Sequence, residues 1–251
     1  MVISGAGDIQ VDVLCAKLKS RFGVETELKP ARVAYREKIK GKVEAHGRHK
    51  KQSGGSGQFG DVWIRFEPQD EQDDMIFAEE VFGGSVPKNF FPSVEKGLRN
   101  AVQKGVLAGY PLVGLKATLY DGSYHPVDSN DMAFQTAARL AYQDGIPKAK
   151  PTILEPIGLL QVTIPDANLG DIMSDISSKR RGTVLGMNAE DGMQTVEAEV
   201  PMAEMSSYTI DLRSMTQGRG SFTCKFIRYE EAPGNVQQKV IEEAKALAEA
   251  E

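Results

Sequence analysis

A histidine, a tyrosine and an aspartate lie close together in the run DGSYHPVDS at residues 121–129. His125 follows Tyr124 directly, and Asp128 comes three residues later, so its carboxylate could brace the imidazole. Such a pair can in principle act as a general base. A histidine in a loop can also stack on a nucleic-acid base and bond to its backbone, or serve only the structure of the loop. Contact with RNA or with a partner is the interpretation that the sequence favours.

This histidine loop joins a strand-like run at 113–120 to a helix-like run that begins at Ser129. A second loop, SGGSGQFG at 53–60, separates two alternating apolar runs that predict a β-hairpin. Its glycine content is typical of a tight connection between strands. We expect the two loops to lie side by side at a protruding tip.

The charge of the chain is strongly uneven. The net charge is −5, but residues 31–61 contain eight cationic and three acidic residues, a local charge of +5. Residues 67–80 contain seven acidic residues and no cation. A basic strand pair that leads to a glycine loop predicts a surface that faces phosphates, since Lys and Arg release the counterions of RNA. A solvated basic face without a partner is the alternative.

Several enzyme classes lack their sequence motifs. No run matches G-x-x-x-x-G-K-[ST], and no serine or cysteine stands in a G-x-S-x-G context, so neither nucleotide hydrolysis nor nucleophilic catalysis is predicted for this chain. The two cysteines, Cys15 and Cys224, are far apart and have no clustered histidines, which argues against a disulfide or a zinc site. We expect no catalytic site, no metal and no cofactor in this chain.

No run approaches the ~18–20 apolar residues of a membrane helix, and the N-terminus lacks the pattern of a signal peptide. The sequence therefore predicts no membrane partner and a cytoplasmic location. A length of 251 residues indicates about two domains. Residues 147–151 have the composition of a linker and mark the boundary.

The apolar periodicities predict an α+β fold. An N-terminal helix should begin near Asp8 and stop at Gly23, and a long helix should cover 88–108. After the linker the order of elements is β-α-β-β-α-β within about 80 residues, which is typical of a ferredoxin-like sheet. The run at 235–251 should be an exposed helix or a frayed tail.

Three adjacent cations, Lys179, Arg180 and Arg181, end the first helix of the ferredoxin-like unit. They could contact RNA phosphates. The alternative is that they only complement the negative end of the helix, a stabilisation of about 0.3–1 kcal/mol.

Taken together, these motifs resemble bacterial elongation factor G, a translational GTPase. The resemblance rests on RVAYRE at 32–37, QSGGSGQFG at 52–60, GSYHPVDS at 122–129, SKRRG at 178–182 and MSSYTIDLRSMTQGRGS at 205–221. These runs follow the order and spacing of the family and cover essentially the whole chain.

The resemblance implies a domain assignment and a fold. Residues 1–29 would be a remnant of the third domain, 31–150 the fourth domain, 151–232 the fifth, and 233–251 a C-terminal helix or tail. The fourth domain would resemble ribosomal protein S5, with a left-handed βαβ crossover, and the fifth would be ferredoxin-like. The GTPase domain would be absent from this chain, so that GTP and magnesium belong to the full-length parent.

The resemblance also implies partners and contact residues. The chain would be a ribosome-binding monomer whose tip holds the tRNA–mRNA duplex in the decoding site during translocation. The tip contacts carried over from the family are Ser53, Gly54, Gly55, Ser56, Gly57, Gln58, Tyr124, His125, Asp128 and Ser129. The contacts with ribosomal RNA would be Lys179, Arg180 and Arg181.

Some positions depart from the usual family pattern. Ser56 stands where family members commonly carry arginine, Asp61 where they carry histidine, and Pro126 where they carry an acidic residue. The third-domain signature reads GDIQVD at 7–12. These departures predict a divergent paralogue. Other hypotheses are a ribosomal protection or recycling factor and, from a different class, a small-ligand regulatory domain or a metabolic enzyme on a ferredoxin-like sheet.

Overall fold

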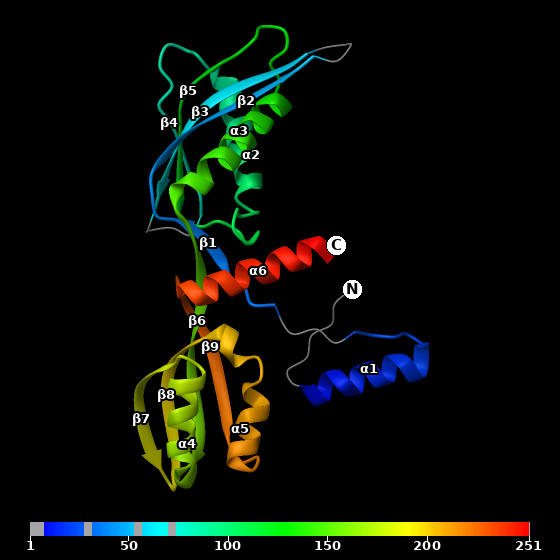
Figure 1. Cartoon of the computed structure of the whole chain (residues 1–251), viewed down its shortest axis with the longest axis vertical. Helices are drawn as coiled ribbons and strands as arrows, with labels where there is room; N and C mark the ends of the chain where they lie inside the picture. The colour runs from blue at the N-terminus through cyan, green and yellow to red at the C-terminus, as the bar shows by residue number, and fades with distance from the viewer. Residues whose placement is uncertain (1–7, 28–31, 53–56, 70–73, 251) are drawn as a thin grey trace. The chain divides into compact units, whose positions relative to one another are not determined.

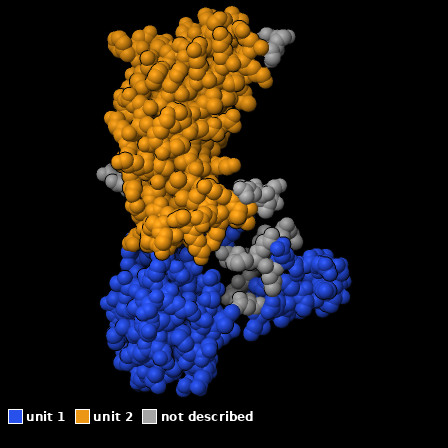
Figure 2. Space-filling view, viewed as in Figure 1, with its two compact units in different colours: residues 1–34, 155–229 blue, residues 35–154, 230–251 orange. Residues whose placement is uncertain are grey.

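The structure is a computed structural model that describes residues 8–27, 32–52, 57–69 and 74–250. The chain forms two compact units (Figure 2). Unit 1 comprises residues 1–34 and 155–229, and unit 2 comprises residues 35–154 and 230–251. Each unit has its own hydrophobic core, as expected for separate domains.

Unit 2 is built on a four-stranded sheet whose order is β2-β3-β5-β4 (Figure 1). Its strands are β2 (Val43–Lys51), β3 (Gln58–Pro68), β4 (Ile76–Glu79) and β5 (Leu115–Ser123). The predicted hairpin is confirmed, because β2 and β3 pair antiparallel from Val43 with Phe66 to Lys51 with Gln58. β4 pairs parallel to β5, so the chain between them makes the βαβ crossover expected for an S5-like domain.

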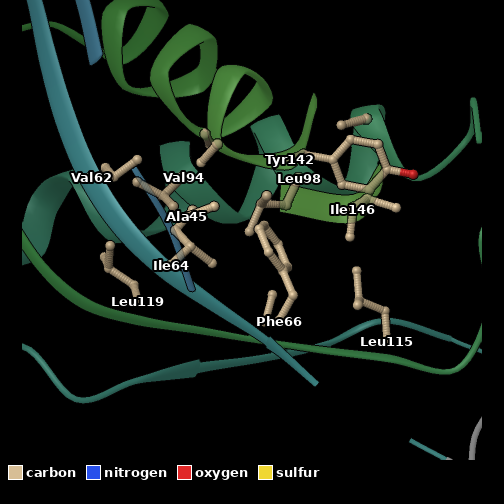
Figure 3. Close-up of a cluster of buried hydrophobic side chains, with 14 of the residues drawn as sticks. Ala45, Val62, Ile64, Phe66, Val94, Leu98, Leu115, Leu119, Tyr142 and Ile146 are labelled. Carbon is tan, nitrogen blue, oxygen red and sulfur yellow. The ribbon is translucent and has the colours of Figure 1, made fainter. Parts of the chain in front are cut away.

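Two helices cover one face of this sheet: α2 (Phe91–Ala101) and α3 (Asp131–Gly145) (Figure 1). Alternate residues of β3, Val62, Ile64 and Phe66, are fully buried between sheet and helices (Figure 3). The short 3₁₀ helices η1 (Lys88–Phe90) and η2 (Ile146–Ala149) flank this pair. The opposite face of the sheet is left to polar, charged and aromatic side chains.

The helix predicted for 88–108 is shorter than expected. It ends at Ala101, and the following loop is held by the buried carboxylate of Glu37. This carboxylate accepts backbone N–H bonds from Leu107 (2.9 Å), Ala108 (2.9 Å) and Tyr110 (3.2 Å). Because these three amides bond to a distant side chain, they do not continue the helical ladder.

Gly47 lets β2 and α3 approach closely. A Cβ atom at this position would lie 2.0 Å from the carbonyl oxygen of Ala137 and 2.6 Å from the amide nitrogen of Ala141. Both are backbone atoms, so neither can move without displacing α3. Only glycine fits at this contact between strand and helix.

We therefore predict that Gly47→Ala lowers the free energy of unfolding of unit 2 by about 1–3 kcal/mol, as overpacking of a core does. Denaturant unfolding followed by the fluorescence of Trp63 measures this, since the chain has one tryptophan and it lies in unit 2. Gly234→Ala is the matched control, because nothing lies within 4 Å of a Cβ at that position. Equal stability of the two variants would contradict the predicted contact.

Unit 2 also contains a strand and a helix from the ends of its two segments. β1 (Arg36–Ile39) pairs antiparallel with the first residues of β6 (Pro151–Pro165), and α6 (Gly234–Ala250) is the C-terminal helix. The side chain of Gln237 donates to Thr152 (2.9 Å) and to the carbonyl of Ala232 (2.7 Å). The sequence predicted an exposed helix or a frayed tail for this segment, whereas α6 is a helix whose Val240 is buried.

Unit 1 begins with α1 (Asp8–Phe22), which stops at Gly23 as predicted. Gly23 is left-handed (φ 65°), and its amide donates to the carbonyl of Lys19 at 3.0 Å. The amide of Val24 donates to the carbonyl of Leu18 at 3.3 Å. The bond from Gly23 to Lys19, with Gly23 left-handed, is the αL ending of a helix.

The rest of unit 1 has the predicted β-α-β-β-α-β order. After β6 come η3 (Asp166–Asn168), α4 (Leu169–Ser174), the π-helical turn η4 (Asp175–Lys179), β7 (Thr183–Glu190), β8 (Met193–Pro201), η5 (Met202–Met205), α5 (Tyr208–Thr216) and β9 (Ser221–Glu231). β6 pairs with β8 and with β9, and β7 pairs with β8, which gives the strand order β9-β6-β8-β7 of a ferredoxin-like sheet. The α+β fold class is confirmed in both units.

Candidate nucleic-acid interface

The described part of the first predicted tip loop, residues 57–60, meets the histidine loop at one end of unit 2 (Figure 1). The amide of Phe59 donates to the carbonyl of Asp128 (2.9 Å), and the hydroxyl of Ser129 donates to the carbonyl of Phe59 (2.9 Å). A Cβ atom on Gly57 would lie 2.6 Å from the Asp128 carboxylate carbon, so a larger residue there would displace the Asp128 side chain. The expected side-by-side arrangement is confirmed for these residues.

Four of the predicted tip contacts, Ser53, Gly54, Gly55 and Ser56, lie outside the described residues. The other six are described, and they are Gly57, Gln58, Tyr124, His125, Asp128 and Ser129. All six belong to the two segments that meet at the tip. Their contact with RNA remains a prediction.

The imidazole of His125 is fixed by the backbone of its own loop. Its Nδ1 atom accepts hydrogen bonds from the amides of Val127 (3.3 Å) and Asp128 (3.1 Å). The amide of His125 donates to the hydroxyl of Ser129 at 2.9 Å, and the amide of Ser129 donates to the carbonyl of His125 at 3.1 Å. Because Nδ1 acts as an acceptor, the ring proton is assigned to Nε2.

This tautomer bears on the chemistry of the loop. The Asp128 carboxylate lies 3.4 Å from Nδ1, but in the Nε2–H tautomer that nitrogen carries no proton to donate to it. The arrangement therefore differs from the aspartate-braced general base that the sequence allowed. With its side chain 51% exposed, His125 can offer its Nε2–H to a phosphate or carbonyl oxygen.

The neighbouring hairpin supplies positive charge and a polar network. The guanidinium of Arg48 lies 5.6 Å from the centre of the Phe59 ring, and His49 bonds to Gln58 at 2.9 Å. The carboxylate of Asp61 accepts from the Ser123 hydroxyl (2.9 Å) and contacts Nε2 of His46 (2.6 Å). Asp61, one of the departures from the family pattern, thus ties together β2, β3 and β5.

The second predicted contact region is the cation run 179–181, in which Arg180 is a core residue. Its side chain is 2% exposed, and its Nε donates to the Asp175 carboxylate at 2.6 Å. The guanidinium also bonds to the carboxylate of Asp211 and to the carbonyl of Glu204, and it lies 4.6 Å from the centre of the Tyr208 ring. This burial does not fit the predicted contact of Arg180 with an RNA phosphate, since protein groups already use its donors.

Lys179 and Arg181 differ from Arg180 in exposure. The side chain of Lys179 is 60% exposed and pairs with Asp211 at 2.8 Å. The side chain of Arg181 is 29% exposed and pairs with Glu155 (2.7 Å) and Glu204 (3.0 Å). The bond to Glu155 is the main reason that the pKa of Arg181 is raised. Lys179 is the member of the run that is best placed for a phosphate.

The same cluster predicts how unit 1 responds to acid. The bond from Lys179, and then that from Arg180, holds the pKa of Asp211 below its ordinary value of 3.8. A carboxylate with a lowered pKa stabilises the fold above the pKa of the unfolded chain and loses this contribution as the pH falls. We expect the melting temperature of unit 1 to fall below about pH 4. In Asp211→Asn the fall in melting temperature with acid should be smaller. An equal fall in the variant and the unchanged chain would contradict the role of Asp211.

Other chemistries find little support in the part of the chain that the structure describes. No group of three or more His, Cys, Asp or Glu side chains there could hold a metal ion. No described helix is both long and apolar enough to cross a bilayer.

The structure adds residues that the sequence analysis missed. Val127, between His125 and Asp128, is 81% exposed at the tip. Trp63 is 39% exposed on the open face of the sheet. The alternation of β3 carried a signal for Trp63, because it stands between the apolar residues Val62 and Ile64.

Comparisons with known proteins give similarities over both units. Residues 31–150 match the family described as "Elongation factor G, domain IV", and residues 152–240 match "Elongation factor G C-terminus". An "Elongation factor G-like protein" of Thermotoga maritima is 49% identical over 243 residues, which are 96% of this chain and 35% of that protein. The chain thus spans about a third of the length of this curated relative.

A solved crystal structure of a protein from Thermus thermophilus is also similar. It superposes with a TM-score of 0.86 at 42% sequence identity, over 96% of this chain and 36% of that chain. The two proteins are therefore similar in sequence as well as in fold.

Proposed function

Because the chain belongs to the elongation factor G family, with the sequence of its domain IV followed by that of its C-terminal domain, we propose that it is the ribosome-facing part of a translational GTPase. A translation elongation factor-like role follows from the family. The finer proposal is that the tip of unit 2 enters the decoding site of the small ribosomal subunit. There it would contact the tRNA–mRNA duplex while the full-length parent promotes translocation.

One observation carries this proposal: the two tip segments are bonded to each other around Phe59 and hold a half-exposed histidine in one tautomer. A preorganised N–H donor beside a basic hairpin suits a phosphate-rich partner, since the donor loses little freedom on binding. Within the chain that the structure describes, Arg48, Lys50 and Lys51 extend this positive surface along β2.

The GTPase reaction is assigned to other parts of the parent. This chain has no P-loop motif, and its described residues offer no acidic cluster for magnesium. We propose that they bind and orient RNA, that the chain acts as a monomer, and that it works in the cytoplasm, where ribosomes are found.

A divergent paralogue is the second candidate, with a role in ribosome protection or recycling. The observation that favours it is Asp61, which places a carboxylate bonded to His46 and Ser123 near the tip. The full-length parent separates the two candidates. A translocase moves tRNA in a reconstituted system, whereas a recycling factor splits ribosomes without moving tRNA.

Co-sedimentation of the chain with purified ribosomes tests the proposal. We expect the fraction that pellets to be largest at low salt and to fall as salt rises, because phosphate contacts release counterions. A variant with Arg48, Lys50 and Lys51 changed to Gln should pellet less and depend less on salt. No co-sedimentation at low salt would contradict ribosome binding by this chain.

A further inference from the structure

The open face of the sheet in unit 2 carries an aromatic platform that the tip does not use. Val62 and Ile64 are fully buried under the helices, and Trp63 between them lies on the opposite face of β3. It is the one tryptophan in the chain, and 39% of its surface is exposed. Trp63 packs not under the helices but against side chains of the neighbouring strands, as cross-strand pairs do.

His46 and Tyr120 extend the platform on the two neighbouring strands. The imidazole of His46 is stacked on the Trp63 indole, with ring centroids 4.4 Å apart and an interplanar angle of 12°. The Tyr120 ring lies 6.4 Å from the indole at 50°. The register of β3 and β5 shifts after Trp63, which pairs with Asp121 while Ile64 pairs with Leu119, so Tyr120 is the extra residue of a bulge. Bulges re-aim side chains in this way.

An arginine lies at each end of this platform, but only the end toward the tip carries net positive charge, because two glutamates pair with Arg65. The guanidinium of Arg65 lies 5.2 Å from the centre of the Tyr120 ring and is oriented by Glu44 (3.2 Å) and Glu80 (3.1 Å). On the side toward the tip, Arg48 lies over Phe59, and the basic end of β2 follows. Positive charge beside stacked aromatic rings is the chemistry by which proteins bind single-stranded nucleic acid.

We infer that this platform binds single-stranded RNA, with an unpaired base stacked on the rings around Trp63 and its phosphates near Arg48. Unpaired bases fit because a duplex keeps its base faces covered, whereas a single strand can splay them onto aromatic side chains. The inference rests on the proposed function and deepens it, because it names unpaired RNA as what the face next to the tip contacts. The strand β3 connects the two surfaces, running from Gln58 at the tip to Trp63.

Trp63 itself reports the binding. We would titrate the whole chain with a mixed-sequence single-stranded RNA of about 12 nucleotides and with the corresponding duplex, a length within the usual site sizes. Stacking is expected to quench the tryptophan fluorescence for the single strand and much less for the duplex. Anisotropy of labelled RNA should show that Trp63→Leu weakens binding about tenfold, while Trp63→Phe retains most of the affinity.

Phe82→Leu is the matched control, since Phe82 is a 92% exposed aromatic residue of the same unit. The Phe82→Leu variant should bind the single-stranded RNA with the same affinity as the unchanged chain. Circular dichroism on each variant verifies that the fold is kept, and the Phe variant preserves the test if the Leu variant unfolds. Equal affinity of Trp63→Leu and the unchanged chain, or binding of the single strand without quenching, would overturn the inference.

Ribosome co-sedimentation separates this inference from the proposed function. If the chain pellets with ribosomes but RNA does not quench Trp63, the platform is refuted and the proposed function stands. If RNA quenches Trp63 but the chain does not pellet, the platform stands and ribosome binding by this chain is refuted.

Discussion

Replacing Arg180 with Met should lower the free energy of unfolding of unit 1 by about 3–5 kcal/mol, the usual cost of removing one partner from a buried ion pair. The side chains of Arg180 and Asp175 are 2% and 8% exposed, so the change leaves a carboxylate without its partner in a buried site. The bonds to Asp211 and to the Glu204 carbonyl are lost as well. Hydrogen exchange of the β6, β8 and α5 amides during denaturant unfolding measures the effect within unit 1.

Lys179→Met is the matched control for this prediction. Lys179 is the preceding cation and shares Asp211, but its side chain is 60% exposed. An exposed ion pair contributes only about 0–1 kcal/mol, so this variant should unfold nearly as the unchanged chain does. If Arg180→Met lowers the free energy of unfolding by less than about 1 kcal/mol, the range of an exposed ion pair, then the buried guanidinium does not stabilise the core of unit 1. The same pair tests RNA contact, because Lys179→Met should weaken binding to ribosomes without destabilising the fold.

Replacing His125 with Ala in a full-length parent should lower the rate of translocation about tenfold or more, while GTP binding and the fold remain intact. The reason is the loss of the Nε2–H donor, since a hydrogen bond to a charged group contributes about 1.5–3 kcal/mol. Alanine also removes Nδ1, which accepts from the amides of Val127 and Asp128. Single-turnover translocation measured with excess factor reports the rate directly.

His125→Asn separates contact from loop structure. The Asn side-chain oxygen can replace Nδ1 as the acceptor, but its shorter side chain does not reach the position of Nε2. If RNA contact is the role of His125, the Asn variant should be as slow as the Ala variant. A rate equal to that of the unchanged parent would reduce His125 to a residue that shapes its loop.

Local patterns were sufficient to predict much of this fold. Gly23 ends α1 in the left-handed conformation that its position suggested. The β-α-β-β-α-β order and the hairpin of β2 and β3 follow from apolar periodicity. These features depend on residues that are close in the sequence, so they can be predicted from the sequence alone.

The features that were missed depend on residues far apart in the chain. The segment after α2 is held by Glu37, which binds amides about 70 residues away, and apolar periodicity contains no sign of that carboxylate. Lys179, Arg180 and Arg181 look equivalent in sequence, yet Asp211, 31 residues after Arg180, helps to draw that one guanidinium into the core. The aromatic platform likewise requires the cross-strand register of His46 with Trp63.

Directed cleavage of ribosomal RNA from the tip is the most direct test of the proposed contact with the decoding site. An iron chelate would be attached at Val127→Cys, which is 81% exposed, after Cys15 and Cys224 are replaced by Ser. A chelate at Gln238→Cys on α6 serves as the control. We predict cleavage of small-subunit RNA around the decoding site from position 127 and a different pattern from position 238. Cleavage from position 127 confined to other RNA, or identical patterns from both positions, would contradict a tip that enters the decoding site.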